Sequence, residues 1–414
     1  MIERKELLDR IVSKMWDGQV KVITGVRRCG KSYLLRTIFK EYLLASGTKP
    51  SSIIELALDS DENSQYRNPV LLGKYLRSKI KNDKNKYYFL IDEIQLAKEV
   101  DNPDCPGDKI GFSDVLIGLS SRKNCDVYVT GSNSKMLSND IITQFRGKND
   151  QIHIGPLSFS EYFPVSGQSE EKAFNEYLLY GGMPATVGMN AQNKEEYLIN
   201  LFNETYLKDL VERHKIERID LLENVLNIIC ATTSNLTNPT NIANSISSVT
   251  NERVCINTVT KFIGFLENAF LISEVKRYDV RGKHYFDYPN KYYFADNGLR
   301  NARLNFRQND KGYLMENTVY NELIFRKYSV DIGVVYDNNR KQREIDFIAG
   351  KDGSKTYIQS AYQIESEKDE ERELRPLEFT NDFFTKICLR NDLLKSYTDE
   401  KGVQNKSVID FLLS

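Results

Sequence analysis

The sequence predicts a multidomain α/β protein whose N-terminal domain is built on a parallel β-sheet. Three short β-rich runs carry this prediction: VKVIT at 20–24, YYFLIDE at 87–93 and DVYVTGSNS at 126–134. A glycine-containing loop and then helical spacing follow the first run, and the other two end in acidic or small polar residues. Apolar runs of this kind are typical of strands that are buried on both faces. At roughly 150 residues per domain, the chain is long enough for about two to four domains.

Composition narrows the classes of function that remain. The chain carries 57 Lys and Arg against 58 Asp and Glu, so no overall field attracts nucleic acid or a membrane, and any nucleic-acid site must be local. The N-terminus is charged and amphipathic, and no window approaches the roughly 18 apolar residues of a membrane span. The 6 cysteines include no CxxC pair and the 3 histidines are isolated, which argues against zinc sites. We therefore expect a soluble, cytoplasmic protein without a membrane partner.

The segment GVRRCGKS follows the first strand and matches the phosphate-loop pattern GxxxxGK(S/T). Its two glycines permit backbone angles that turn amide N–H groups inward, and the next helix adds its positive N-terminal end. Lys31 is expected to reach the β- and γ-phosphates of ATP, and Ser32 to ligate Mg²⁺. The predicted nucleotide-binding residues are Gly25, Val26, Arg27, Arg28, Cys29, Gly30, Lys31 and Ser32.

A partner motif supports the loop, which composition alone would produce in roughly one chain of this length in a hundred. The run YYFLIDE ends in Asp92 and Glu93, and a buried parallel strand would deliver both carboxylates to its carboxyl end. Asp92 is expected to hold the magnesium shell and Glu93 to polarise the attacking water. The alternative is a core strand followed by an exposed acidic turn.

Other residues are candidates for contact with the γ-phosphate. Ser132 and Asn133 follow the third strand, although Gly-Ser-Asn is also ordinary chemistry for a turn. Charge developing on the γ-phosphoryl group calls for a cation, often an arginine of the same or a neighbouring subunit. Arg146 in QFRGK is the leading candidate, with Arg27 and Arg28 as alternatives. A donor from a neighbouring copy would make the protein a homo-oligomer.

Ten stretches, in order along nearly the whole chain, match one known family. They are GVRRCGKSYLL, YYFLIDEIQ, VYVTGSNSKML, FRGK, PLSFSEYF, YLLYGGMPA, ETYLKDL, KYYFADNGLRNA, GYLMENTVYNEL and REIDFIAG. By these motifs the chain resembles the bacterial and archaeal AAA+-like ATPases that carry a C-terminal domain of unknown function. PLSFSEYF together with YGGMP is the most specific part of the resemblance.

The resemblance implies a core sheet with strand order 5-1-4-3-2 and three further modules. The expected boundaries are 1–165 for the ATPase domain, 166–230 for a helical lid, 231–305 for a winged-helix-like module and 306–414 for a restriction-endonuclease-like α/β domain. The order of helical and strand patterns and of Gly and Pro breaks along the sequence agrees with these boundaries.

The winged-helix-like module offers a local patch for DNA. Two helices are expected in residues 239–275, and a basic, aromatic hairpin follows like a wing. Such a patch suits phosphate contacts, but winged helices also serve as protein-docking modules. The candidate residues are Asn257, Thr258, Thr260, Lys261, Lys276, Arg277, Arg281 and Lys283.

The C-terminal domain follows the element order of a metal-dependent nuclease but lacks part of its chemistry. Glu316 and Asp346 match two of the acids that hold metal in active relatives of that fold. The third position reads Gln359-Ser360-Ala361, so an amide replaces a carboxylate and alanine replaces the lysine. We expect a domain that no longer cuts, unless a lysine such as Lys355 or Lys368 is supplied from elsewhere.

These patterns together predict a Mg²⁺-dependent ATPase that acts as a nucleotide-driven switch on a protein or DNA partner. One alternative is an ATP-regulated, metal-dependent nuclease. The other is a DNA-binding regulator that uses ATP only to set its conformation.

Overall fold

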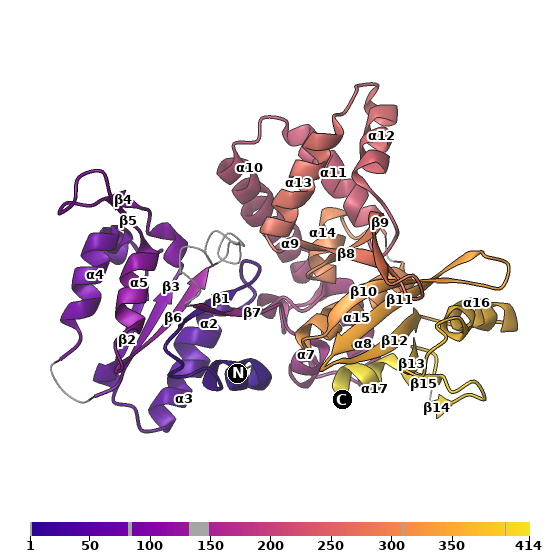
Figure 1. Cartoon of the computed structure of the whole chain (residues 1–414), viewed down its shortest axis with the longest axis horizontal. Helices are drawn as coiled ribbons and strands as arrows, with labels where there is room; N and C mark the ends of the chain where they lie inside the picture. Colours follow the sequence, from indigo (N-terminus) through magenta and orange to yellow (C-terminus); the bar gives the residue numbers. More distant parts are fainter. Residues whose placement is uncertain (1, 82–84, 132–148, 309, 394) are drawn as a thin grey trace. The chain divides into compact units, whose positions relative to one another are not determined.

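The computed structural model divides the chain into two compact units (Figure 1). Each unit has a hydrophobic core of its own. Unit 1 contains Met1–Gly155 and Asn268–Phe270, and unit 2 contains Pro156–Glu267 and Leu271–Ser414. The division therefore falls ten residues before the boundary expected at residue 165. The residues described are 2–81, 85–131, 149–308, 310–393 and 395–414.

Unit 1 is built on a five-stranded sheet in the order β2-β3-β6-β1-β7, in which all neighbouring strands are parallel. Numbered along the chain and read from the other edge, this order is 5-1-4-3-2, so the predicted order is confirmed. The strands are β1 (Val20–Thr24), β2 (Ile53–Ala57), β3 (Tyr87–Asp92), β6 (Cys125–Gly131) and β7 (Asn149–His153).

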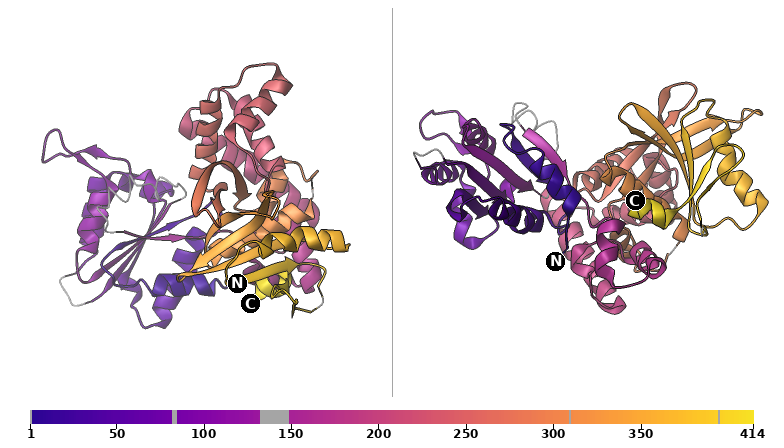
Figure 2. Two further views of the ribbon diagram at one scale, coloured as in Figure 1. Left: turned by 45° about the vertical axis from the view of Figure 1, so that its right-hand side comes forward. Right: turned by 90° about the horizontal axis from the view of Figure 1, so that it is seen from below.

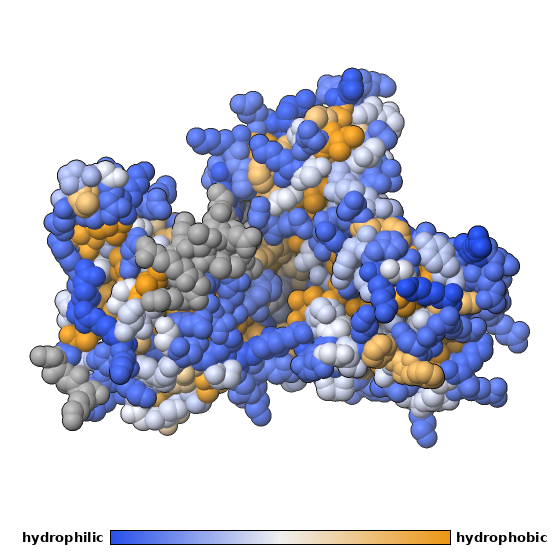
Figure 3. All heavy atoms as spheres, viewed as in Figure 1, coloured by the Kyte–Doolittle hydropathy of each residue, from blue (hydrophilic) through white to orange (hydrophobic). Residues whose placement is uncertain are grey.

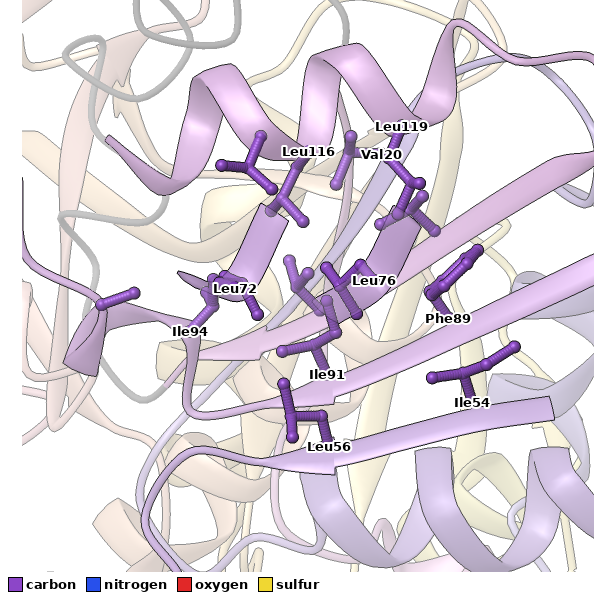
Figure 4. Close-up of a cluster of buried hydrophobic side chains, with 14 of the residues drawn as sticks. Val20, Ile54, Leu56, Leu72, Leu76, Phe89, Ile91, Ile94, Leu116 and Leu119 are labelled. Atoms are coloured by element: carbon purple, nitrogen blue, oxygen red, sulfur yellow. The ribbon is translucent and has the colours of Figure 1, made fainter. Parts of the chain in front are cut away.

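Helices cover both faces of this sheet (Figures 1 and 2). They are α1 (Lys5–Val12), α2 (Lys31–Tyr33), η1 (Leu34–Phe39, wound as a π-helix), α3 (Lys40–Ala45), α4 (Pro69–Ser78) and α5 (Phe112–Ser120). Figure 4 shows leucines of α4 and α5, such as Leu72 and Leu116, packed against Phe89 and Ile91 of β3. On the opposite face, Phe39 packs on Tyr128 of β6, with ring centroids 4.7 Å apart. Every residue of the central strands is thus buried, as their continuous apolar runs predict.

Short elements complete unit 1. They are the helical turns η2 (Pro50–Ser52), η3 (Asp61–Arg67) and η4 (Ile94–Leu96), and the two-stranded ribbon of β4 (Val100–Asp101) and β5 (Lys109–Ile110).

The first half of unit 2 is helical. Its elements are α7 (Phe159–Ser166), α8 (Glu170–Tyr180), η6 (Pro184–Thr186), α9 (Ala191–Asn200), η7 (Leu201–Leu207, a π-helix), α10 (Lys208–His214), α11 (Ile219–Ala231), α12 (Pro239–Thr250) and α13 (Ile256–Asn268). Ser158 caps α7 in a reciprocal pair with Glu161, as the S-x-x-E spacing favours. This helix begins within PLSFSEYF, one of the family-specific motifs.

The second half of unit 2 is organised by an eight-stranded mixed sheet in the order β14-β15-β13-β12-β11-β10-β8-β9. Its strands are β8 (Ile272–Asp279), β9 (His284–Phe294), β10 (Ser329–Tyr336), β11 (Gln342–Lys351), β12 (Ser354–Ala361), β13 (Thr385–Arg390), β14 (Tyr397–Thr398) and β15 (Gln404–Ser407). The helices of this half are α14 (Asn297–Arg303), α15 (Lys311–Phe325), α16 (Glu367–Glu378) and α17 (Val408–Leu413).

The hairpin of β8 and β9 corrects one sequence-based expectation. It was predicted as the wing of a module ending at residue 305, but β8 pairs in parallel with β10, so one sheet continues across that boundary. The reason lies in the aromatic end of β9, which is buried from Asn290 to Phe294. Tyr293 stacks on Tyr320 of α15 with ring centroids 4.3 Å apart. An exposed wing would leave these rings in water.

Hydrophilic residues dominate the face of the molecule shown in Figure 3. Among the described residues, no helix is both long and apolar enough to cross a membrane.

Candidate nucleotide-binding site

Three neighbouring strands of unit 1 end at one edge of the sheet and bring the predicted motifs together. In the order β3-β6-β1 all strands are parallel, so Asp92, Thr130 and Thr24 lie at their carboxyl ends. All three residues are buried. The glycine loop leaves β1 at this same edge, which is where parallel α/β sheets place their ligands.

The loop Gly25–Gly30 has the backbone that a phosphate cradle requires. The φ angles of Gly25, Arg28 and Gly30 are +148°, +60° and +100°. Positive φ at these positions turns backbone amides toward one side and creates a concavity for an anion. At Gly25 a Cβ would lie 2.0 Å from the carbonyl oxygen of Ile154, so only glycine fits. The helix that follows begins at Lys31 and adds its N-terminal end to the cradle.

Lys31 is folded into the loop. Its buried ammonium donates hydrogen bonds to the carbonyl oxygens of Gly25, at 3.0 Å, and Val26, at 2.8 Å. Ser32, the next residue of the helix, is half-buried. Both side chains therefore come from the first turn of the helix, as the motif predicts, and the loop residues fit a bound phosphate chain.

The two acidic residues after β3 are held by a threonine that the sequence did not single out. The hydroxyl of Thr130 donates a hydrogen bond to Asp92 Oδ1, and it accepts one from the backbone N–H of Glu93 at 3.1 Å. Glu93 adopts a φ of +55°, and Gln95 donates to its Oε2. Asp92 is buried and fixed in position, so it is not part of an exposed acidic turn, which was the alternative. Non-glycine residues with a positive φ, such as Glu93, are common at functional sites.

The structure describes only two of the remaining candidates for contact with the γ-phosphate. Ser132, Asn133 and Arg146 lie outside the described residues. Arg27 is half-buried and Arg28 is exposed, and both are within the loop.

Sequence reasoning also missed Arg4 and His153. The buried guanidinium of Arg4 donates to the carbonyl oxygen of Cys29, at 3.0 Å, and to that of Gly155, at 3.1 Å. His153 ends β7, and its Nδ1 lies 3.3 Å from the hydroxyl of Thr24. Loss of hydration around the ring and the positive charge of Lys31 lower the pKa of His153 to about 4, although part of the residue stays exposed. The imidazole is therefore neutral at pH 7.

The nuclease-like candidates of unit 2 do come together. Glu316 and Asp346 both contact Lys291, at 2.9 Å and 3.7 Å. The side chain of Gln359 accepts a hydrogen bond from the Asp346 N–H at 3.3 Å and donates one to Glu373. The lysines considered as replacements are elsewhere, since Lys355 lies over the ring of Tyr278 and Lys368 is exposed. Within the described parts of the chain, no group of three or more His, Cys, Asp or Glu is arranged to hold a metal ion.

Comparison with known proteins identifies the domain that contains the loop Gly25–Ser32. Residues 17–163 match the family model of an AAA domain, and residues 171–310 match a domain of unknown function (DUF8612). A Haemophilus influenzae protein is 32% identical over 420 residues, covering 100% of this chain and 99% of its own length. A Methanocaldococcus jannaschii protein is 29% identical, covering 88% of this chain and 79% of its own. Neither relative has an assigned function.

Among solved structures, a Walker-type ATPase of Pyrococcus abyssi is similar to this chain. It is 15% identical, with a TM-score of 0.49, over 73% of this chain and 96% of the other. The family assignment rests on the AAA domain match and on the full-length relative. The chain belongs to the family of AAA+-like P-loop ATPases that carry a C-terminal domain of unknown function.

Proposed function

We propose that the protein binds Mg-ATP at the loop Gly25–Ser32 and hydrolyses it with Asp92 and Glu93. One observation carries this proposal: Thr130 fixes Asp92 and Glu93 at the sheet edge from which the loop leaves β1. A structural loop would need no pair of positioned carboxylates beside it. The AAA domain match over residues 17–163 supports the same reading.

Each residue of the site has a proposed role. The backbone of the loop surrounds the phosphates, and Lys31 exchanges its bonds to Gly25 and Val26 for phosphate oxygens. Ser32 and Asp92 hold Mg²⁺, which would neutralise charge on the phosphate oxygens. Glu93 accepts a proton from the attacking water through its carboxylate. Ser132, Asn133 and Arg146 remain proposals for contact with the γ-phosphate, with Arg146 supplied by the same chain or by a neighbouring copy.

We further propose that nucleotide binding is transmitted to unit 2 along the chain. Arg4 joins the loop carbonyl of Cys29 to Gly155, the last residue before unit 2 begins at Pro156. Ile154 approaches the same loop, because its N–H donates to Thr24 and its carbonyl lies against Gly25. A loop that moves on binding phosphate would therefore pull on the chain at the junction.

The burial and contacts of two hairpin cations favour a protein partner over DNA. Arg277 is buried and lies over the ring of Phe286, and Arg281 donates to the carbonyl oxygen of Phe379. Of the hairpin cations, Lys276 and Lys283 are exposed, and Asn257, Thr260 and Lys261 of α13 are exposed as well. A duplex-DNA mobility shift that disappears on replacing Lys276 and Lys283 with alanine would instead support the DNA-binding alternative.

Two substitutions separate binding from hydrolysis. Lys31→Ala should abolish measurable ATP binding, since it removes the cation for the β- and γ-phosphates. Glu93→Gln should keep ATP affinity within a few-fold and lower kcat by roughly 10²–10⁴, the usual contribution of a general base. Calorimetric titration and phosphate release measure the two effects. Glu62→Gln, an exposed acid of η3, is the matched control and should turn over normally.

Normal turnover in both Lys31→Ala and Glu93→Gln would disprove the assignment. The nuclease alternative predicts cutting of DNA or RNA with Mg²⁺ or Mn²⁺ that is lost in Asp346→Ala.

A further inference from the structure

Four charged side chains meet inside unit 2, away from the nucleotide loop. Lys291 of β9 directs its ammonium at Glu316 of α15 and at Glu344 and Asp346 of β11. Its Nζ lies 2.9 Å from Glu316 Oε1, 2.7 Å from Glu344 Oε1 and 3.7 Å from Asp346 Oδ1. The Lys291 side chain is 3% exposed, and those of Glu316 and Asp346 are 9% and 10% exposed. The Glu344 side chain is 32% exposed, so two buried carboxylates and one part-exposed carboxylate surround a buried cation.

The central cation allows these acids to stay ionised together. Buried carboxylates repel one another and lose hydration, and only a nearby positive charge offsets both costs. Burial and Glu316 raise the pKa of Asp346 well above its usual range, while Lys291 opposes the shift. Burial alone would lower the pKa of Lys291, but Glu316, Asp346 and Glu344 outweigh it and raise this pKa. The lysine is therefore charged.

Neighbouring groups fix the carboxylates around that centre. The hydroxyl of Tyr293 donates to Glu316 Oε1 at 2.6 Å, and the backbone N–H of Ser360 donates to Asp346 Oδ2 at 2.9 Å. Carboxylates from separate elements that converge on one point are the usual way in which proteins hold divalent metal. Here the point of convergence is already taken by an ammonium group.

We propose that Lys291 occupies the place of a divalent metal ion between Glu316, Glu344 and Asp346. With Lys291 in place, these three acids are not arranged to hold a metal ion themselves. The ammonium holds them together and stabilises unit 2 without metal chemistry. Gln359 and Ala361 fit this assignment, because an amide and a methyl group stand where a nuclease-like site would need a metal ligand and a lysine. Nothing in this assignment depends on ATP hydrolysis.

The test is Mn²⁺ binding by the full chain without nucleotide, measured by the loss of the free-ion electron spin resonance signal. The unaltered protein should bind no Mn²⁺ at this cluster. Lys291→Ala removes the ammonium and leaves the carboxylates, so it should gain one Mn²⁺, and adding Asp346→Asn should remove that gain. Lys355→Ala is the matched control, because Lys355 lies in the same sheet but over Tyr278. It should bind as the unaltered protein does.

Two results would overturn the proposal. One is a folded Lys291→Ala protein that gains no Mn²⁺, and the other is Mn²⁺ binding by the unaltered protein that Asp346→Asn abolishes. If Lys291→Ala does not fold, stability decides between the alternatives. Lys291→Met should lower the melting temperature of unit 2, and Glu316→Gln added to it should recover much of the loss. A double variant no more stable than Lys291→Met would show that Lys291 is not the compensating cation.

Discussion

Gly25 is the residue at which the phosphate loop leaves no room for a side chain. A Cβ there would meet the Ile154 carbonyl oxygen at 2.0 Å, and the φ of +148° is one that residues with side chains rarely adopt. Gly25→Ala must therefore displace the loop or the end of β7. We expect ATP affinity to fall roughly tenfold to a hundredfold, the equivalent of about 1.4–2.8 kcal/mol of strain. Calorimetric titration with Mg-ATP measures the change.

Gly118 provides the control for Gly25. It lies inside α5 of the same unit, and a Cβ there would meet nothing within 4 Å. Gly118→Ala should leave ATP affinity unchanged and stabilise the helix by up to about 1 kcal/mol, because alanine is the better helix former. Equal ATP affinity in the two variants would contradict the close approach at Gly25.

Thr130 is the residue that positions the two acidic groups. Thr130→Val keeps the shape of the side chain but removes the hydroxyl that binds Asp92 and accepts from the Glu93 N–H. Leaving these buried groups without their partner should cost about 1–3 kcal/mol of stability and slow hydrolysis more than it weakens ATP binding. Urea unfolding and steady-state kinetics measure the two effects. Thr130→Ser keeps the hydroxyl and should behave nearly as the unaltered protein; a Val variant with full turnover would refute the role.

At the scale of single residues, local motifs could be predicted and distant partners could not. The sequence singled out Lys31, Asp92 and Glu93 as candidates, because a strand, a loop and a helix in succession constrain their chemistry. The roles of Arg4 and Lys291 were not predicted, because the role of a buried lysine or arginine depends on partners from distant parts of the sequence. Arg4 finds its partners at Cys29 and Gly155, 25 and 151 residues away in sequence.

At the scale of elements, the glycines of YGGMP are explained by the backbone that packs on them. A Cβ at Gly182 would lie 2.2 Å from the Leu157 carbonyl oxygen, and one at Gly298 would lie 2.0 Å from that of Tyr180. Asp296 joins these segments, since its carboxylate accepts from the N–H groups of Gly182, at 2.7 Å, and Leu299, at 3.0 Å. The family-specific motifs therefore form one structural joint, where PLSF, YGGM and ADNGL meet within unit 2.

This joint should make the stability of unit 2 depend on pH. Burial raises the pKa of Asp296 to about 6, although three backbone N–H groups oppose the shift. Because the folded pKa lies above the unfolded value of about 3.9, the stabilisation is complete below about pH 4 and is lost as pH rises through 6. The total change is on the order of 2–3 kcal/mol.

Asp296→Asn does not titrate and provides the reference for that effect. Urea unfolding of both proteins across this pH range should show the unaltered protein losing stability relative to Asp296→Asn as pH rises. A constant difference between the two proteins would show that Asp296 does not titrate in this window.

The sheet of unit 1 was predictable and that of unit 2 was not, for one physical reason. Parallel strands buried on both faces leave continuous apolar runs that can be read locally, as in β1, β3 and β6. The hairpin of β8 and β9 is amphipathic and basic, so its sequence suits a free wing as well as it suits a sheet. The position of the hairpin depends on the pairing of β8 with β10. Because β10 lies about 55 residues further along the chain, this pairing produces no local pattern in the sequence.

At the scale of the whole molecule, the two units share a chain junction at which the nucleotide loop is anchored. Arg4, Ile154 and Gly155 connect the loop to the last residues of unit 1. The sequence gives no sign of this connection, since Arg4 precedes an ordinary charged helix. It follows that the binding energy of ATP should act on unit 1 directly and on unit 2 through the chain crossings, at Gly155–Pro156 and on either side of Asn268–Phe270.

Thermal unfolding should therefore reveal two transitions, of which Mg-ATP raises only one. Each unit has its own core, so each is expected to unfold as a cooperative body. At about one hundred times its Kd, ATP should stabilise unit 1 by about 2.7 kcal/mol. Calorimetry should find this shift lost in Lys31→Ala and kept in Glu93→Gln. Ser158→Ala, which removes the cap of α7 and about 1 kcal/mol, identifies the transition of unit 2. A single transition that both ATP and Ser158→Ala move would mean that the units unfold together, and the junction would then be one connection among several.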